Sequence, residues 1–365
     1  MNTRTQLKTP NFFHDKPLFG LDIGHGSLKV MQLEERTVGK NHPRKVVGYG
    51  FTRFDKAAQK DGVVIQPEII AQATYKLFKD SLVGDITTNR VAVAIPAYRT
   101  FTRSLQLPKL QPKELKEAVE LEAEQYISMP LEDLYLDYEI VRQTSDNTEL
   151  FMVAVPRVIV DSYLSLVQMV GLETVLIEPT LSSSSRLFSV DNNSNEATFI
   201  IDFGSESSDI SIFDKHLLVT GTVQGGGEIF TNNIKNQLNV TAEAAALIKT
   251  RYGLGVSKRQ KEIKEALDPV LAQIVKEIRR MLRYYEERYG TDRPINQIII
   301  LGGGANMPGL TEYFTDVLRM AVRHTDPWGY FDYKGLQPPD RADRPMYATV
   351  AGLSMADPKE MFIHD

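Results

Sequence analysis

The stretch DIGHGSLK, residues 22–29, decides how the first part of the chain is expected to fold. It joins a short apolar run, residues 18–23, to a second strand-like run, residues 29–33, and two such runs around a glycine-rich turn predict a β-hairpin. Glycine leaves backbone N–H groups accessible, so a turn of this kind can cradle phosphates. Asp22 can hold Mg²⁺ through water, and Lys29 supplies a cation. The stretch therefore predicts a β-hairpin whose turn offers the groups that phosphate binding requires.

Two later stretches repeat this theme. DFGSESSD, residues 202–209, again places an aspartate before a glycine turn, and LGGGANMPG, residues 301–309, follows the buried run 298–301. A single Asp-x-Gly turn is most often only a tight hairpin, but three glycine turns in this order are far more specific. Because the pattern strand, glycine turn, strand opens both halves of the chain, it predicts two related lobes. A helix is expected near 309–322, after the third turn.

The alternation of strand-like and helical patterns divides the chain into segments with different expected roles. Residues 1–17 are expected to be a flexible polar tail, and the polar cluster at 191–195 a linker. The predicted division is a first-lobe core at 18–98, completed by 172–190 and a C-terminal helix at 347–365; an inserted βαββα subdomain at 99–171; a second-lobe core at 196–228 and 291–346; and a helical subdomain of the second lobe at 229–290.

The composition narrows the classes of function. The 365 residues include no cysteine, which excludes disulfides and thiolate metal sites, and the six histidines show no spacing typical of a zinc site. No run approaches 18 apolar residues, so no membrane-spanning segment is expected. The net charge of −5 provides no overall attraction to nucleic acid. Residues 249–293 hold 12 basic and 7 acidic residues, a mixture that favours an amphipathic helix with a solvated face over a nucleic-acid patch.

The ordered triplet of glycine turns resembles the actin-like ATPase superfamily, which includes actin, Hsp70, sugar kinases and FtsA. Further segments look like the type IV pilus assembly proteins of the PilM family, in the FtsA/PilM branch. These segments are Leu107-Pro108, Glu114-Leu115, 122–127, 131–133, 153–156, Gly171-Leu172, Glu178-Pro179, Gly226-Gly227-Glu228 and 347–353. The resemblance covers about residues 18–355. It implies an α/β protein of the actin-like ATPase fold, with ribonuclease H-like duplicated lobes around a nucleotide cleft and an inserted subdomain of the FtsA/PilM type.

The resemblance also implies ATP and Mg²⁺ as cofactors, held by the matching motifs. The two Asp-x-Gly hairpins would grip the phosphates from opposite sides, and the late glycine turn would receive the adenosine. The implied metal ligands are Asp22 and Asp202. The implied nucleotide-binding residues are Gly24, His25, Gly26, Ser27 and Lys29 of the first hairpin, Gly204, Ser205 and Ser207 of the second, Gly226, Gly227 and Lys249, and Gly302, Gly303, Gly304 and Met307 of the third turn.

A few positions depart from the superfamily pattern. Ala246 stands where a glutamate commonly contacts the sugar, and Glu206 brings a negative charge into the second phosphate turn. His25 replaces a small hydroxyl residue and is either a turn residue in solvent or a phosphate contact. For hydrolysis, Glu178 is the candidate to orient the attacking water, and the alternative is a solvated carboxylate before Pro179.

A PilM-like protein is expected to be a cytoplasmic, ATP-binding platform protein of a type IV pilus or a related secretion or competence machinery. It would reach the inner membrane by binding the cytoplasmic N-terminal segment of a PilN-like membrane protein, at the first lobe and the inserted subdomain. Nucleotide-gated lobe closure would control this contact, with weak or no ATP hydrolysis. Other partners implied by the resemblance are the pilus assembly ATPase, platform components and a second copy of the chain, whereas neither nucleic acid nor direct membrane insertion is expected.

Three alternatives stay open at this point. An FtsA-like cell-division filament protein should end in a linker and a basic amphipathic helix, which residues 354–365 do not show. A sugar or small-molecule kinase on the same fold should carry a general base and clusters of sugar-binding polar residues, and none is evident. A scaffold that has lost nucleotide binding is kept open by Ala246 and Glu206.

Overall fold

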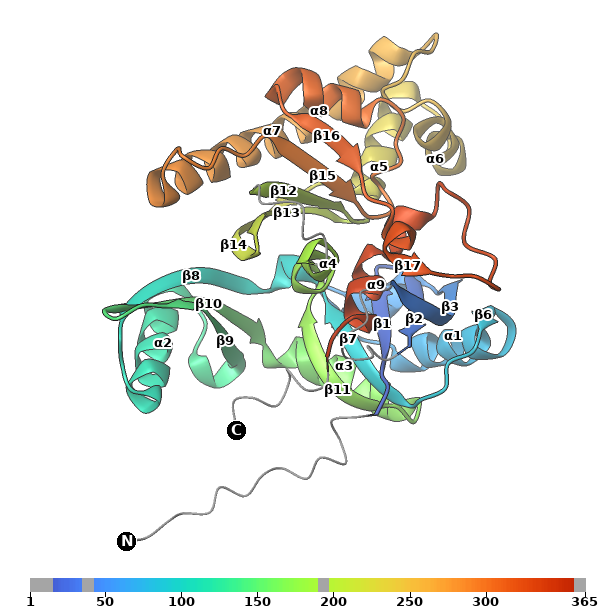
Figure 1. The fold of residues 1–365 in the computed structure, drawn as a ribbon. Coiled ribbons are helices and arrows are strands. Elements are labelled where there is room, and N and C mark those ends of the chain that lie inside the picture. Colours follow the sequence, from blue (N-terminus) through green and yellow to red (C-terminus); the bar gives the residue numbers. More distant parts are fainter. Residues whose placement is uncertain (1–15, 35–42, 190–196, 358–365) are drawn as a thin grey trace, which may run out of the picture.

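The strand, turn, strand patterns that open the two halves of the chain form the centres of two lobes (Figure 1). The computed structural model describes residues 16–34, 43–189 and 197–357. Residues 1–15 of the predicted tail, the predicted linker at 191–195 and residues 358–365 of the predicted C-terminal helix lie outside the described residues.

The first lobe is built on one mixed sheet. Its strands are β1 (Phe19–Gly24), β2 (Ser27–Leu33), β3 (Arg44–Arg53), β6 (Leu82–Gly84), β7 (Arg90–Ile95), β11 (Glu173–Pro179) and β17 (Phe331–Asp332). They lie in the order β11-β7-β1-β2-β3-β17, and β6 pairs with β3. The strands β1, β2 and β3 are antiparallel neighbours, whereas β7 runs parallel to β1 and β11 runs parallel to β7. A separate short hairpin consists of β4 (Gln59–Lys60) and β5 (Val63–Val64).

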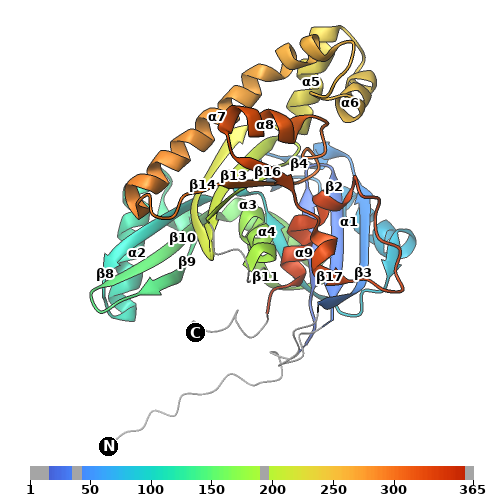
Figure 2. The same ribbon diagram turned by 45° about the horizontal axis from the view of Figure 1, so that its top comes forward.

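Helices cover both faces of this sheet, because its central strands are apolar on both sides and every residue of β7 is buried. Helices α1 (Pro67–Asp80) and α3 (Arg157–Met169) pack on one face, while α9 (Ala348–Ser354) and α4 (Thr180–Ser189) lie against the other (Figure 2). The C-terminal helix predicted at 347–365 is shorter than expected, because α9 ends at Ser354.

The second lobe repeats the strand order of the first. Its strands are β12 (Thr198–Phe203), β13 (Ser207–Asp214), β14 (His216–Gln224), β15 (Gln297–Leu301) and β16 (Ala321–His324), and its helices are α5 (Gly227–Leu238), α6 (Ala242–Arg251), α7 (Gln260–Tyr289) and α8 (Leu310–Leu318). The order β14-β13-β12-β15-β16 corresponds to β3-β2-β1-β7-β11, again with antiparallel neighbours first and parallel pairs last.

The helix expected near 309–322 is wrong in its second part. Helix α8 ends at Leu318, and Arg319 then adopts a left-handed φ of 58°. The chain continues as the edge strand β16, which pairs with β15. A four-residue strand is too short to show the alternation that identifies a strand in sequence. Among the helices of the described residues, none is long and apolar enough to cross a membrane.

The inserted subdomain, residues 101–156, stands beside both lobes. It contains the strands β8 (Phe101–Pro108), β9 (Leu134–Gln143) and β10 (Asn147–Pro156) and the helix α2 (Pro112–Tyr126). The antiparallel order is β8-β10-β9, and Leu115, Val119 and Ala123 of α2 form its small core with the sheet. Strand β8 also contacts β14, where Ser104 Oγ donates to the Leu218 carbonyl at 2.5 Å.

Helix α3 falls within the segment 99–171 that is predicted to form this subdomain, but it packs elsewhere. Ile159, Val160 and Tyr163 are buried in the same core as Leu21 of β1. The apolar face of α3 matches the first-lobe sheet, so its contacts place the helix with the first lobe.

Candidate functional site

A cavity of about 600 Å³, called the main cavity below, lies between the two lobes. Its size is typical of small-molecule sites. All three glycine turns reach its wall, from the β1–β2 turn, the β12–β13 turn and the segment after β15. The predicted residues that line it are Asp22, Gly24, His25, Gly26, Ser27, Lys29, Asp202, Gly204, Ser205, Ser207, Gly227, Lys249, Gly302, Gly303 and Gly304. The fold thus brings together motifs from both halves of the sequence.

In the first hairpin, two opposite charges face each other. Asp22 on β1 is the cross-strand partner of Lys29 on β2, and Lys29 Nζ donates to Asp22 Oδ2 at 2.7 Å. Both side chains are buried, so each depends on the other as its charge partner. Gly26 closes the turn with a φ of 82°, a conformation that favours glycine.

In the second hairpin, two carboxylates occupy the corresponding places. Asp202 on β12 is the cross-strand partner of Asp209 on β13. Burial, followed by the charge of Asp209, raises the pKa of Asp202 to about 7. Burial also raises the pKa of Asp209 to about 6, although hydrogen bonds from Thr222 and Ser207 oppose this rise. This side of the cavity therefore favours a bound proton or cation.

The third glycine turn packs directly against the second hairpin. Gly302 has a φ of 87°, and a Cβ at this position would collide with Asp202 Oδ1. The Gly304 N–H donates to the Phe203 carbonyl at 2.9 Å. Gly303, by contrast, has open space where a Cβ would stand. The turn thus needs glycine at 302 for close approach to the aspartate.

The start of helix α5 forms another part of the cavity wall. The N–H groups of Gly227 and Glu228 donate to the carbonyls of Gly204 and Ser205, each at 2.9 Å. Lys249 Nζ donates to the Gly227 carbonyl at 2.5 Å, and burial lowers the pKa of Lys249 while Glu228 opposes this shift. An ammonium group therefore lies at the cavity wall, beside the second glycine turn.

Three predicted site residues do not line the main cavity. Both carboxylate oxygens of Glu178 accept hydrogen bonds from the Arg186 guanidinium at 2.7 Å, so this carboxylate is neither free in solvent nor aimed at the cavity. Gly226 packs on the backbone of Ser205, and Met307 is buried in the second-lobe core.

His25 is in contact with the opposite lobe. Its side chain is 19% exposed, with Nδ1 3.5 Å from Glu206 Oε2 and Nε2 3.8 Å from Glu228 Oε2. Neither interpretation of His25, a solvated turn residue or a phosphate contact, includes this position between two carboxylates of the second lobe.

The sequence patterns miss several residues of the cavity wall. Asp209 was within reach of sequence reasoning, because hairpin spacing places it opposite Asp202. Glu228 and Asn306 lie in the quoted stretches 226–228 and 301–309 but are not among the predicted site residues. The others follow no motif, and only the fold brings them to the wall: Phe51, Arg53, Gln59, Tyr98, Thr180, Thr231, Asp343 and Met346. In the part of the chain that the structure describes, no group of three or more His, Asp or Glu side chains forms a ready-made metal cage.

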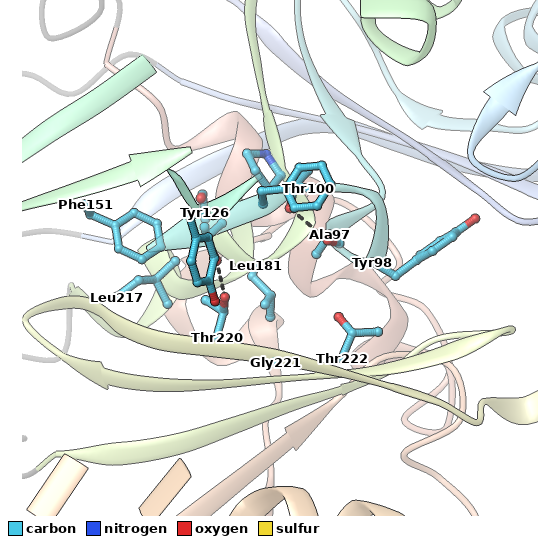
Figure 3. A pocket seen from close by; sticks show the side chains of 14 residues that line it. Ala97, Tyr98, Thr100, Tyr126, Phe151, Leu181, Leu217, Thr220, Gly221 and Thr222 are labelled. Carbon is cyan, nitrogen blue, oxygen red and sulfur yellow. Dashed lines mark hydrogen bonds between the residues drawn. The ribbon is translucent and has the colours of Figure 1, made fainter. Parts of the chain in front are cut away.

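A second cavity of about 220 Å³ lies where the inserted subdomain meets α4 and β14 (Figure 3). Its wall combines aromatic and aliphatic side chains, including Tyr126, Phe151 and Leu181, with threonine hydroxyls. Tyr98, at its edge in Figure 3, also lines the main cavity. Thr222 lines the second cavity and donates to Asp209 of the main cavity at 2.6 Å. The two cavities are therefore joined through Tyr98, which lines both, and through the hydrogen bond between Thr222 and Asp209.

The duplicated sheets, the cavity between them and the inserted subdomain define a protein of the actin-like ATPase fold, as predicted. More particularly, the chain belongs to the type IV pilus assembly protein PilM family, whose model matches residues 20–357.

Solved structures agree with this assignment of the fold. The chain is similar to the PilM–PilN type IV pilus biogenesis complex, with a TM-score of 0.79 and 22% identity over 93% of this chain and 98% of that chain. It is also similar to MreB 5 of Spiroplasma citri bound to AMPPNP, with a TM-score of 0.52 and 14% identity over 93% of this chain and 96% of that one.

The chain is also similar in sequence to the cell division protein FtsA of several bacteria. The Bacillus subtilis protein is 25% identical over 270 residues, which cover 64% of this chain and 58% of FtsA. The Enterococcus faecalis protein is 22% identical over 347 residues, covering 83% of this chain and 77% of FtsA. The match thus spans somewhat more than half of the length of the Bacillus relative.

Proposed function

We propose that this chain is an ATP-binding platform protein of a type IV pilus or a related secretion or competence machinery. The main cavity would bind ATP with Mg²⁺, and the first lobe and inserted subdomain would bind the cytoplasmic N-terminal segment of a PilN-like membrane protein. The observation that carries the proposal is the convergence of three glycine turns from both lobes on one cavity, in a chain of the PilM family.

The groups of the main cavity fit a nucleotide and its metal ion. The two glycine hairpins and the ammonium groups of Lys29 and Lys249 suit phosphates. Mg²⁺ commonly uses one or two carboxylates and keeps several waters, and Asp22 and Asp202 both reach the cavity. A divalent cation would favour the charged form of Asp202, whose pKa is raised in its absence.

Weak or absent hydrolysis is part of the proposal. A water attacking the terminal phosphate must be oriented by a positioned group. Glu178, the predicted candidate, has both carboxylate oxygens engaged by Arg186. This ion pair supports the proposal that the chain binds ATP but hydrolyses it slowly or not at all.

Charge supports a basic partner segment at the inserted subdomain. Residues 101–156 contain 5 basic and 11 acidic residues, so this subdomain carries a net charge of −6 where the whole chain carries −5. Cytoplasmic segments beside membrane-spanning helices are rich in Lys and Arg, and complementary charge speeds association. The second cavity adjoins the subdomain and has room for an apolar side chain of such a segment. A chain bound in this way would lie at the cytoplasmic face of the inner membrane.

Nucleotide gating is supported by the side chains that join the two cavities. A nucleotide that contacts both lobes can shift the population of closed molecules by its higher affinity for that state. Tyr98 and Thr222 connect the second cavity to Glu206 and Asp209 in the main cavity. These two side chains give a change at the β12–β13 turn a direct path to the proposed partner site.

Heating the protein with and without Mg²⁺ and ATP tests the nucleotide part. We expect saturating ATP to raise the melting temperature by several degrees, because a ligand of the folded state stabilises it. Asp202→Ala should lose most of this increase, whereas Asp61→Asn, which changes an exposed carboxylate outside the cavity, should keep it. An unchanged melting temperature in the unmodified protein would contradict ATP binding.

Titration with a labelled synthetic PilN-like N-terminal peptide tests the partner. We expect binding that weakens with added salt and with charge reversal on α2, in the double variant Glu117→Lys/Glu124→Lys. The matched control is Glu265→Lys/Glu287→Lys, which reverses two exposed charges on α7. Absence of peptide binding together with filament assembly in the presence of ATP would instead favour the FtsA-like alternative. The similarity to FtsA proteins supports that alternative.

A further inference from the structure

Glu206 stands at the tip of the second phosphate turn and reaches across to the first lobe. Its Oε2 accepts a hydrogen bond from the Tyr98 hydroxyl at 3.2 Å and lies 3.5 Å from His25 Nδ1. His25 belongs to the first phosphate turn, between Gly24 and Gly26. The carboxylate of one phosphate turn therefore contacts a side chain of the other.

Glu228 at the start of α5 extends this contact. Its carboxylate lies 3.8 Å from His25 Nε2 and forms an ion pair with Lys56 of the first lobe. His25 thus lies between two carboxylates of the second lobe, and His25, Glu206 and Glu228 all belong to the wall of the main cavity. We call these side chains, with Tyr98 and Lys56, the interlobe contact.

We infer that Glu206 is an internal anion that competes with the terminal phosphate of a nucleoside triphosphate, so that the site distinguishes ATP from ADP. The inference rests on the proposed function, because it requires a nucleotide in the main cavity. A phosphate group gripped by both turns must share their surroundings with the Glu206 carboxylate, and no other acidic side chain lies in either turn, residues 25–26 and 204–206.

The competition is electrostatic and unequal for the two nucleotides. A triphosphate carries one more phosphate group than a diphosphate, and repulsion between like charges grows with the charge present. ADP can bind while Glu206 stays with Tyr98 and His25. ATP must move the carboxylate away, which releases the hydroxyl of Tyr98 and the imidazole of His25 as hydrogen-bond donors for the phosphates. The contacts of Glu206 with Tyr98 and His25 are therefore broken by ATP and persist with ADP.

Calorimetric titration of the full chain with ATP and with ADP, both with Mg²⁺, tests the inference. In Glu206→Gln we expect the Kd for ATP to fall about five- to tenfold and the Kd for ADP to fall less than about twofold, because the side chain keeps its shape but loses its charge. Glu206→Ser also removes the charge, so the Kd values for ATP and for ADP should each change in the same direction as in Glu206→Gln. Asp80→Asn, which removes an exposed carboxylate at the end of α1 in the first lobe, should change neither affinity.

The outcomes separate this inference from the proposed function. If no variant binds either nucleotide, the proposed function fails and the inference fails with it. If both nucleotides bind and the ratio of their Kd values is the same in Glu206→Gln as in the unmodified protein, only the inference is overturned. Weaker ATP binding in Glu206→Gln also overturns it, because the carboxylate would then help to hold the nucleotide or its cation.

Discussion

In the first glycine hairpin Asp22 faces Lys29 across the strands, whereas in the second Asp202 faces Asp209. The backbone register is the same in both, since each aspartate pairs with the residue seven positions later. The side chains that the register brings together are oppositely charged in the first hairpin and alike in the second. The duplicated fold thus repeats geometry without repeating electrostatics.

Because of this difference, the buried charges of the two hairpins are compensated in different ways. The first hairpin is neutralised by its own lysine, which donates to the aspartate at 2.7 Å. The second hairpin holds carboxylates whose pKa values are raised to about 7 for Asp202 and about 6 for Asp209. It is stabilised by protons in acid and, under the proposed function, by a metal ion at neutral pH. We therefore expect the stability of the second lobe to depend more on a bound ligand than the stability of the first lobe does.

The largest expected effect is in the first hairpin. Lys29→Met leaves the buried carboxylate of Asp22 without its partner, and we expect the free energy of unfolding to fall by about 3–5 kcal/mol. Lys56→Met, which removes a more exposed lysine from an ion pair, should cost less than about 1 kcal/mol. Urea denaturation at neutral pH measures both. Equal small losses would show that the first hairpin does not depend on its internal ion pair.

An intermediate effect is expected where the glycine turn after β15 meets the second hairpin. Gly302→Ala combines a left-handed φ with a collision at Asp202, so we expect a loss of about 2–4 kcal/mol. Gly303→Ala is the matched control, because the added methyl group meets open space, and its melting temperature should stay within about 1–2 °C. Similar stability for the two variants would contradict the close approach of this turn to the aspartate.

The smallest effect has the opposite sign and concerns the second hairpin. The raised pKa values of Asp202 and Asp209 mean that the folded chain binds more protons than the unfolded chain, whose carboxyl groups titrate near about 4. The stability of the nucleotide-free protein should therefore fall as the pH rises from about 4 to about 7. Asp209→Asn should remove part of this slope and add roughly 1–3 kcal/mol at about pH 8.

Thermal unfolding across this pH range checks the prediction. The comparison variant is Asp61→Asn, whose exposed carboxylate should leave the slope unchanged. A destabilised Asp209→Asn protein at about pH 8, or a flat profile for the unmodified chain, would mean that the two hairpins do not differ as described.

Local patterns predicted much of the fold because hairpins and buried strands are encoded by neighbouring residues. The glycine turn at 22–29 forms the β1–β2 hairpin, and its charged ends face each other as hairpin spacing requires. The edge strand β16 was missed because its four residues show no period, and α3 was placed in the inserted subdomain because chain order does not reveal which sheet a helix covers. Errors therefore arose where assignment depended on long-range packing.

The sequence by itself determined the duplicated strand, turn, strand pattern, the glycine turns and the family, since all of these depend on residue types at short spacings. Only the tertiary structure decided that Glu178 pairs with Arg186 and that Glu206 reaches His25 and Tyr98. A long charged side chain has several rotamers, and its choice is set by the partners that the fold brings near. For that reason the motifs indicate where phosphates would bind. The contacts between the lobes indicate how the chain would distinguish ATP from ADP.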